Sequence, residues 1–234
     1  MIRTAAKLRI AEVFASIQGE GIWAGTPSVF VRISGCNLRC RWCDTPYASW
    51  HPEGEVWDFD KVAEEALRSG IRHVVLTGGE PMLFDGTVEL AEALRRAERT
   101  ITIETAGTVF RELPCDLMSI SPKLANSVPD DPQLGRSHQA TRIQSDALRA
   151  LIGAYPCQLK FVVGDDARGD VAEVEALLEK LPPVRPESIL LMPEGRDSET
   201  LHRRARLLAP ICMERGWRLG PRLHIDLYGD RRGT

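Results

Sequence analysis

Short apolar runs alternate along the chain with longer segments in which apolar residues recur at the spacing of a helix face. The apolar runs predict strands over residues 10–17, 28–33, 73–77, 100–105, 117–121, 158–163 and 188–192. The helical spacing predicts helices over residues 59–69, 88–98, 171–181 and 199–214. Gly70 is a typical helix stop, and Pro210 is expected to kink or break the last helix.

Strands and helices alternate in the order that is typical of βαβ units around a parallel sheet. About six repeats fit into the chain, fewer than the eight of a complete TIM barrel. We therefore expect an α/β fold, a partial, open (β/α)6-type TIM-like barrel, in one domain over residues 1–234. The polar segment 126–139 carries Pro129 and Pro132 and fits neither pattern, so we expect a mobile loop there.

Composition limits the kinds of partner that the chain can have. Its 234 residues are 43% hydrophobic, which is enough for one sizeable core. The net charge of −3 argues against nucleic acid as the main partner. The chain has no apolar run long enough to span a membrane, and residues 1–7 lack the apolar core of a signal peptide. We expect a cytoplasmic protein with reduced thiols.

Three cysteines lie close together in the sequence, at the spacing C-x3-C-x2-C, with no fourth ligand nearby: Cys36, Cys40 and Cys43. A structural zinc site closes with four ligands, whereas a cubane iron–sulfur cluster on three thiolates keeps one iron open for chemistry. Gly35 permits a sharp turn before the first cysteine, and Trp42 can cover the site with an apolar ring. A zinc knuckle short of one ligand and three unrelated thiols stay open as alternatives. The isolated Cys115, Cys157 and Cys212 are expected in the core.

Two further motifs flank the cysteines. Thr77 to Pro81 reads Thr-Gly-Gly-Glu-Pro and follows a buried strand, where glycines let the backbone approach a ligand. Taken alone, this motif also fits an ordinary strand-to-helix turn. Residues 18–21 read Gln-Gly-Glu-Gly, and the amide of Gln18 and the carboxylate of Glu20 suit a flat heterocycle with amide and amino edges. The alternative here is a hairpin turn.

In these motifs the chain resembles the radical SAM superfamily and, within it, the 7-carboxy-7-deazaguanine synthases, which share the Gln-Gly-Glu-Gly segment before the cysteine loop. The resemblance implies a [4Fe-4S] cluster on the three cysteines and S-adenosyl-L-methionine (SAM) on the open iron. It also implies a homodimer, a pterin substrate, and an electron donor such as flavodoxin or ferredoxin. Thr45 is implied as a Mg²⁺ ligand. Because one neutral hydroxyl binds Mg²⁺ weakly, we expect the metal to need substrate.

The resemblance also assigns residues to SAM and to the substrate. The expected SAM contacts are Trp42, Cys43, Asp44, Gly79, Glu80, Ser121, Pro122, Lys123 and Lys160. The expected substrate contacts are Ile17, Gln18, Gly19, Glu20, Arg32, Thr77 and His224. Lys160 stands among apolar strand neighbours and is costly there unless it is paired or reaches a cavity. Other readings are a solvated strand charge for Arg32, a turn residue for Thr45 and a half-exposed strand histidine for His224.

The implied reaction is radical chemistry by a lyase of queuosine and 7-deazapurine biosynthesis. SAM receives an electron from the cluster and yields a 5′-deoxyadenosyl radical, which abstracts hydrogen from 6-carboxy-5,6,7,8-tetrahydropterin. Ring contraction and loss of ammonia then give 7-carboxy-7-deazaguanine, and no protein residue acts as the abstracting group. Two alternatives stay open at this point. One is a radical SAM activase that makes a glycyl radical on a partner protein, and the other is a non-catalytic zinc or electron-transfer module.

Overall fold

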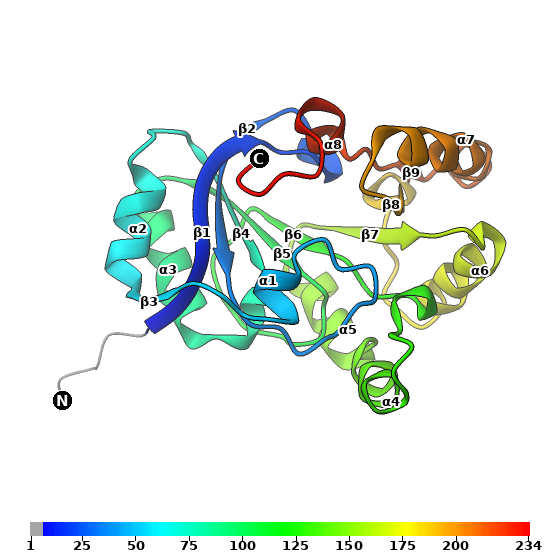
Figure 1. The fold of residues 1–234 in the computed structure, drawn as a ribbon, viewed down its shortest axis with the longest axis horizontal. Coiled ribbons are helices and arrows are strands. Elements are labelled where there is room, and N and C mark those ends of the chain that lie inside the picture. The colour runs from blue at the N-terminus through cyan, green and yellow to red at the C-terminus, as the bar shows by residue number, and fades with distance from the viewer. Residues whose placement is uncertain (1–6) are drawn as a thin grey trace.

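A nine-stranded sheet runs through residues 7–234, the part of the chain that this computed structural model describes (Figure 1). The strand order across the sheet is β3-β1-β2-β4-β5-β6-β7-β8-β9. The strands are β1 (Lys7–Ile17), β2 (Pro27–Ile33), β3 (Glu55–Asp58), β4 (His73–Gly78), β5 (Thr100–Thr105), β6 (Leu117–Ile120), β7 (Cys157–Val163), β8 (Ile189–Pro193) and β9 (Arg218–Leu219). The prediction that residues 1–7 are not a signal peptide falls mostly on residues 1–6, which lie outside the described residues.

The sheet is parallel from β2 to β9, and β1 pairs antiparallel with both β2 and β3. Strands β2 and β4 to β8 are the six parallel strands of the predicted partial barrel, so the predicted fold class is confirmed. No helix lies in the connection between β5 and β6, residues 106–116, so one of the six repeats lacks its helix.

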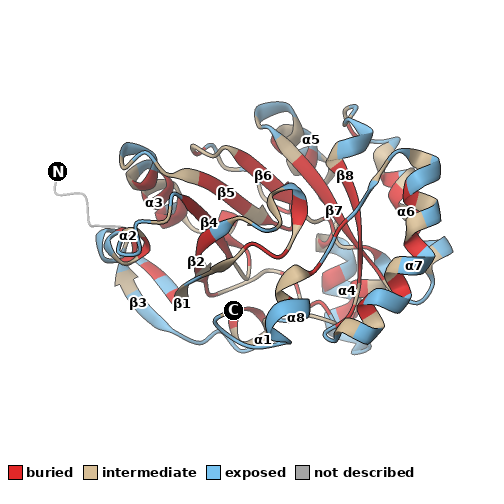
Figure 2. Cartoon of the chain, turned by 90° about the horizontal axis from the view of Figure 1, so that it is seen from above, coloured by how far each residue is buried: buried red, intermediate tan, exposed pale blue. Residues whose placement is uncertain are grey.

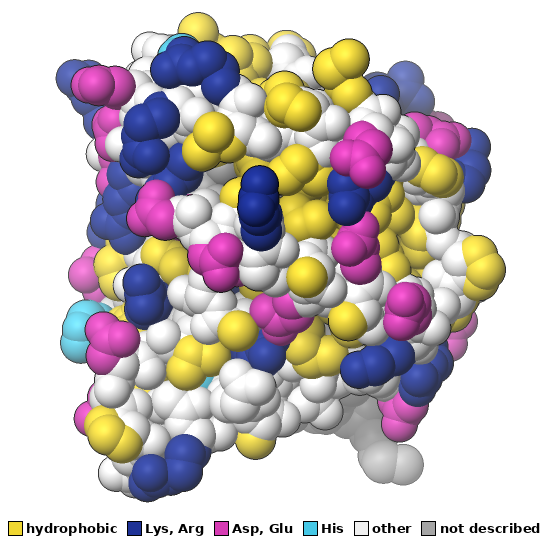
Figure 3. Space-filling model, turned by 90° about the vertical axis from the view of Figure 1, so that its right-hand side faces the viewer, with side chains coloured by type: hydrophobic (Ala, Val, Ile, Leu, Met, Phe, Trp, Pro, Cys, Tyr) yellow, Lys and Arg dark blue, Asp and Glu magenta, His cyan; other side chains and the backbone are white. Residues whose placement is uncertain are grey.

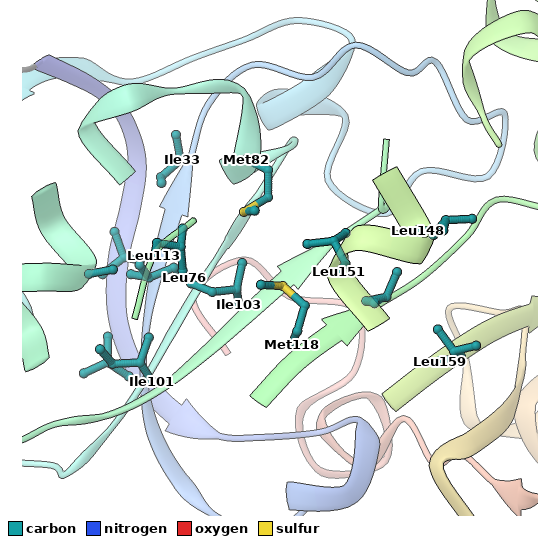
Figure 4. Close-up of a cluster of buried hydrophobic side chains, with 14 of the residues drawn as sticks. Ile33, Leu76, Met82, Ile101, Ile103, Leu113, Met118, Leu148, Leu151 and Leu159 are labelled. Atoms are coloured by element: carbon teal, nitrogen blue, oxygen red, sulfur yellow. The ribbon is translucent and has the colours of Figure 1, made fainter. Parts of the chain in front are cut away.

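The helices pack around the sheet and bury its outer side (Figure 2). The α-helices are α1 (Pro46–Ser49), α2 (Phe59–Leu67), α3 (Asp85–Arg96), α4 (Pro132–Thr141), α5 (Ser145–Ala154), α6 (Ala167–Leu178), α7 (Ser198–Arg215) and α8 (Leu223–Tyr228). Short 3-10 helices cover η1 (Gly21–Trp23), η2 (Pro81–Leu83), η3 (Ala125–Ser127) and η4 (Pro186–Ser188). Figure 4 shows Ile103 and Met118 of neighbouring strands beside Leu151 of α5 in this core.

The segment 126–139 is not the mobile loop that its polarity and prolines predicted. Its residues form the end of η3 and most of α4. Pro132 is the first residue of α4, a position where proline's missing N–H is no loss. The carboxylate of Asp131 caps the helix and accepts from the backbone N–H groups of Gln133 and Leu134 at 3.0 and 2.8 Å.

Helix α7 also departs from its prediction. It runs through Pro210 as one helix, so the predicted break is wrong. Pro210 has no N–H to donate to the carbonyl of Arg206. Because it lies on the exposed face of the helix, water can donate to that carbonyl instead. The helix begins after the Asp197 cap and ends at Gly216, which has a φ of 67°.

The three isolated cysteines lie in or against the core. Cys212 is buried, and Cys115 and Cys157 pack against the core, as expected. No helix within residues 7–234 is long and apolar enough to cross a membrane. On the face that carries α6 and α7, acidic and basic side chains are interspersed with apolar ones (Figure 3).

Candidate active site

One cavity of about 250 Å³ lies at the carboxyl ends of the parallel strands and collects the predicted site residues. All of them except Glu80 and Pro122 line it. The residues predicted for the cluster, for SAM and for the substrate therefore face the same space.

The two-residue period of the strands decides which side chains reach this cavity. In β2, Val31 and Ile33 join the core under the helices, whereas Arg32 between them lines the cavity. In β7, Leu159 and Phe161 join the core and Lys160 lines the cavity in the same way. A parallel strand that is apolar on its outer side can therefore carry one charged group inward.

The three cysteines lie on the loop between β2 and α1, and all are free thiols that line the cavity. Their loop begins at Gly35, whose φ of 119° favours glycine. Burial raises the pKa of Cys36 to about 11 and of Cys40 to about 12. Metal binding at this loop must therefore displace thiol protons.

The cysteine loop fits an iron–sulfur cluster in its donors and its surroundings. The backbone N–H of Leu38 points to Cys36 Sγ at 3.3 Å, and the Ser49 hydroxyl lies 3.1 Å from Cys43 Sγ. Hydrogen bonds to sulfur are one of the ways in which proteins tune such clusters. Among residues 7–234, no three side chains of the usual ligand types are gathered closely enough to hold a single metal ion.

The glycine turn after β4 packs directly against the cysteine loop. A Cβ on Gly79 would lie 2.1 Å from the carbonyl oxygen of Gly35, so only glycine fits. The backbone N–H groups of Gly79 and Glu80 donate to the carbonyls of Ile33 and Gly35 at 2.9 and 2.8 Å. The turn therefore sets the distance between the ends of β2 and β4.

Glu80 holds this turn from below and does not reach the cavity. It is fully buried, and its carboxylate accepts from the backbone N–H groups of Met82 and Ala106 and from the Thr105 hydroxyl, at 3.0, 2.7 and 2.8 Å. Burial raises its pKa, and these hydrogen bonds partly oppose the rise. The structure thus gives the Glu80 side chain a place under the turn, and leaves the backbone around Gly79 facing the cavity.

A network of alternating charges connects the far sides of the cavity. Lys160 Nζ lies 2.8 Å from Glu20 Oε2 and 3.6 Å from Glu104 Oε1. Arg222 Nε lies 3.1 Å from Glu20 Oε1, and its Nη2 donates to Asp44. Each charge in the network faces an opposite one.

The pKa values in this network follow from that pairing. Burial alone would raise the pKa of Glu20, but Lys160 and Arg222 outweigh it and hold it below its usual range. The same balance lowers the pKa of Asp44, chiefly through Arg222. Burial would lower the pKa of Lys160, but Glu104 and Glu20 raise it. Glu20, Asp44 and Lys160 are therefore charged at neutral pH. The buried lysine is thus paired, as its position among apolar strand residues required.

Glu104 and Arg222 are site residues that the sequence predictions missed. Glu104 accepts from Gln18 Nε2 at 3.2 Å and from the Thr77 hydroxyl at 2.8 Å, so it orients two predicted substrate contacts. A carboxylate at the end of the apolar strand 100–105 is the same signal that singled out Lys160. Arg222 has no such signal, because its partner Glu20 is 202 residues away along the chain.

Arg32 is held by a second cluster at the edge of the cavity. Its Nε donates to Glu12 Oε1 at 2.6 Å, and the Tyr47 hydroxyl donates to the same oxygen at 2.7 Å. Burial would lower the pKa of Arg32, but Tyr47 and Glu12 raise it. Arg232 lies 4.1 Å from the centre of the Tyr47 ring, so the C-terminal tail covers this side, a contact not predicted from the sequence.

His224 lies in α8 rather than in a strand and packs against the Gln18–Gly21 segment. A Cβ on Gly19 would lie 1.9 Å from its Nδ1, which explains the glycine at that position. The Leu223 N–H donates to the Gly19 carbonyl at 2.9 Å and fixes the contact. Burial lowers the pKa of His224, so the ring is neutral and can exchange donor and acceptor roles with a ligand.

The other predicted residues lie on the cluster side. Lys123 Nζ donates to the Ser121 hydroxyl at 2.8 Å and lies 5.4 Å from the centre of the Trp42 ring. Thr45 precedes α1, and its hydroxyl lies 3.8 Å from Cys43 Sγ. Pro122 is buried beside Ser121 and Lys123 without lining the cavity.

Comparisons with known proteins agree with this site. The radical SAM superfamily matches residues 30–128, which include the three cysteines and the Gly79 turn. The chain is 44% identical over 231 residues to 7-carboxy-7-deazaguanine synthase of Rhodopirellula baltica, a match that covers 97% of this chain and 89% of that protein. The same-named protein of Halobacterium salinarum is 44% identical over 240 residues, covering 97% and 93%.

A solved structure is similar over most of its length. The crystal structure of QueE from Escherichia coli superposes with a TM-score of 0.69 at 27% sequence identity. The match covers 92% of this chain and 93% of that one. The partial barrel described here is therefore shared over nearly the whole of both chains.

Proposed function

Since the chain belongs to the 7-carboxy-7-deazaguanine synthase family within the radical SAM superfamily, we propose that it converts 6-carboxy-5,6,7,8-tetrahydropterin into 7-carboxy-7-deazaguanine. The activity is that of a lyase in deazapurine and queuosine biosynthesis, in which a ring contracts and ammonia is lost. Family membership selects this activity over a glycyl-radical activase and over a zinc or electron-transfer module. The observation that carries the proposal is that the cysteine loop and the Gln18–Gly21 segment line one cavity.

The cluster side of the cavity would hold the cofactors. Cys36, Cys40 and Cys43 would ligate the [4Fe-4S] cluster, and SAM would lie between Trp42 and the backbone around Gly79. When bound, the cluster and SAM supply the one-electron chemistry that starts hydrogen abstraction from the substrate. Other SAM contacts from this chain are proposed at Asp44, Ser121, Lys123 and Lys160. Glu80 and Pro122, which were also predicted as contacts, are buried behind the lining and would support the site from there.

The substrate side would bind and orient the pterin. The amide of Gln18 and the carboxylates of Glu20 and Glu104 offer donors and acceptors to the heterocycle's edge. Arg32 would bind the substrate carboxylate through its guanidinium, since Glu12 fixes only its Nε. Ile17, Gly19, Thr77 and His224 complete the lining on this side. No side chain is required to abstract hydrogen, so these residues act by holding the substrate in place and excluding water.

A Mg²⁺ ion is proposed at Thr45. Thr45 lines the cavity next to Asp44, whose carboxylate is already paired with Arg222. Substrate oxygens and water would have to supply the other ligands. We therefore expect Mg²⁺ to bind with the substrate and not before it.

The chain is further proposed to act as one radical SAM domain over residues 1–234, as a homodimer in the cytoplasm. A small electron-transfer protein such as flavodoxin or ferredoxin would reduce the cluster. These proposals rest on the family resemblance. Sedimentation of the loaded protein and reduction by each candidate donor test them directly.

The proposed activity has a direct assay. Protein purified without oxygen is loaded with iron and sulfide and incubated with SAM, a reductant, Mg²⁺ and 6-carboxy-5,6,7,8-tetrahydropterin. Mass spectrometry should detect 7-carboxy-7-deazaguanine and release of ammonia. If the loaded protein binds SAM and still leaves this pterin unchanged, the proposed substrate is wrong.

A further inference from the structure

We propose that His138 of α4 is a positioning residue for the cysteine loop, residues 36–43, called the cluster loop below. Its ring fixes the backbone beside Cys40. His138 Nδ1 lies 3.0 Å from the backbone N of Arg39, the residue before that cysteine. The histidine is 2% exposed, so no water can easily take its place. This proposal rests on the proposed function only in taking the three cysteines as the cluster's ligands.

A chain of hydrogen bonds decides which ring nitrogen carries the proton. The Ser127 hydroxyl donates to the carbonyl of Leu124 at 2.6 Å, so toward the ring it can only accept. His138 Nε2 lies 2.9 Å from that hydroxyl and must therefore be the protonated nitrogen. Nδ1 is left with a lone pair, which is what the N–H of Arg39 needs. Ser127 thus sets the tautomer with which His138 holds the loop.

Two neighbouring contacts strengthen the same attachment. The backbone N–H of Arg41 donates to the Ser127 carbonyl at 2.9 Å, and Trp42 Nε1 donates to Asn126 Oδ1 at 3.1 Å. All three donors lie between the first and third cysteines of the loop. Every acceptor belongs to the 126–139 segment, for which the sequence analysis predicted a mobile loop.

The cluster loop depends on this attachment because it has few regular contacts of its own. Within residues 36–43, the backbone N–H of Cys43 donates to the Cys40 carbonyl at 3.2 Å, and Arg39 Nη1 donates to the carbonyls of Cys36 and Leu38 at 2.8 and 2.7 Å. The spacing of the thiols is thus set partly from outside the loop. Outer contacts of this kind alter metal affinity by about 10–100-fold.

The test uses two substitutions that each keep one half of the ring's hydrogen bonding. In His138→Asn the side-chain oxygen lies near the position of Nδ1 and can still accept from Arg39. In His138→Gln the amide reaches toward Ser127 and leaves the Arg39 N–H without an acceptor. Both remove the ring, so a merely structural role affects them alike. Thr141→Ala, which removes an exposed hydrogen bond to the Ser137 carbonyl, is the matched control.

Two readouts separate this proposal from the activity assay. The first is hydrogen exchange of the Arg39 amide in cluster-free protein. The second is the rate at which a chelator removes iron from the loaded protein. We expect His138→Gln to exchange and to lose iron at least about tenfold faster than wild type, with His138→Asn close to wild type. Equal behaviour of the Asn and Gln variants, whether both normal or both impaired, overturns the proposal.

Ser127→Ala provides a second test that leaves the histidine in place. Without the serine hydroxyl, the Nε2–H of His138 has no acceptor, and the ring is no longer held in place facing the Arg39 N–H. We expect faster exchange of the Arg39 amide in this variant than in Thr141→Ala, by a larger factor than for amides in the core of the sheet. Unchanged protection of that amide contradicts the role given to Ser127 and His138. Because neither readout requires turnover, failure of the proposed substrate leaves this test intact.

Discussion

Lys160 and Glu20 form a buried ion pair, 2.8 Å between Nζ and Oε2, that joins the seventh strand to the Gln18–Gly21 segment. The lysine side chain is only 5% exposed, so its charge depends on this carboxylate and on Glu104. The pair ties a predicted SAM contact to a predicted substrate contact. It therefore fixes one side of the cavity to the other.

Replacing Lys160 by methionine should leave Glu104 without the ion pair that it forms in the structure, and Glu20 with Arg222 alone. Removal of one partner of a buried pair typically costs about 3–5 kcal/mol. We expect a loss of that order in the free energy of unfolding, measured by urea denaturation of the cluster-free protein. Arg68→Met, which removes the exposed ion pair with Glu65, is the control and should cost less than about 1 kcal/mol. A cost for Lys160→Met as small as the control's would show that the pair is not buried.

Gly79→Ala should disrupt the joint between the glycine turn and the cysteine loop. The added Cβ would lie 2.1 Å from the Gly35 carbonyl oxygen and 2.6 Å from that of Ala48. We expect the variant to lose iron loading, measured by iron analysis after reconstitution. Gly153→Ala in α5, where a Cβ meets nothing within 4 Å, should load normally and gain roughly 0.5–1 kcal/mol of stability. Normal loading of Gly79→Ala would refute this close packing.

His73 should make stability depend on pH. Burial lowers its pKa from 6.5 to about 4, so the unfolded chain takes up a proton at a pH where the folded protein does not. Stability from the neutral ring is complete above about pH 6.5 and falls as the pH drops toward 4, by up to about 3 kcal/mol.

The check is chemical denaturation between about pH 7 and pH 5, where His73→Asn should lower the slope of stability against pH by up to about 1.4 kcal/mol per unit. His202→Asn, at a side chain that is 60% exposed, is the matched control for loss of an imidazole. Equal slopes in all three proteins would exclude His73 as the titrating group.

Arg32→Gln should weaken substrate binding without affecting the cofactors. Losing a charge-assisted pair with a carboxylate costs about 1.5–3 kcal/mol, or roughly 10–100-fold in affinity. We expect that loss in the titration of the loaded protein with the pterin, while iron content and SAM binding stay unchanged. Arg9→Gln, which removes an exposed hydrogen bond to the Gly54 carbonyl, should bind substrate normally. An unchanged affinity of Arg32→Gln would remove this arginine from the substrate site.

Local patterns predicted the parts of the site that are local in the chain. The cysteine loop and the glycine turn each occupy a few consecutive residues, and Arg32 was assigned through the family resemblance of the segment just before that loop. Such signals depend on the backbone geometry of short segments, which sequence spacing reflects directly. The fold class followed from the same alternation.

The residues that complete the site through long-range pairing could not be found in this way. Arg222 meets Glu20 and Asp44 from the other end of the chain, and its own segment has no pattern that indicates those partners. Glu104 had a signal, since a charge at the end of an apolar strand needs a partner. Its particular partners, Gln18, Thr77 and Lys160, follow only from the folded sheet.

The misprediction of the 126–139 segment has a physical cause. Helix α4 buries Gly135 and His138, a small residue and a polar one, so its buried side carries no apolar stripe. The two ring nitrogens of His138 hydrogen-bond to the cluster loop and to Ser127. A helix that packs through hydrogen bonds in this way looks like a polar loop in the sequence.

The most direct measurement compares wild type with Cys36→Ala, Cys40→Ala and Cys43→Ala in the anaerobic assay with SAM, reductant and 6-carboxy-5,6,7,8-tetrahydropterin. We expect the wild type to form 7-carboxy-7-deazaguanine. Each variant should fold, lack the cluster's absorption and form no product, because all three thiolates are needed to hold the cluster. Full turnover by any of the three variants, or no product from a fully loaded wild type, would contradict the account.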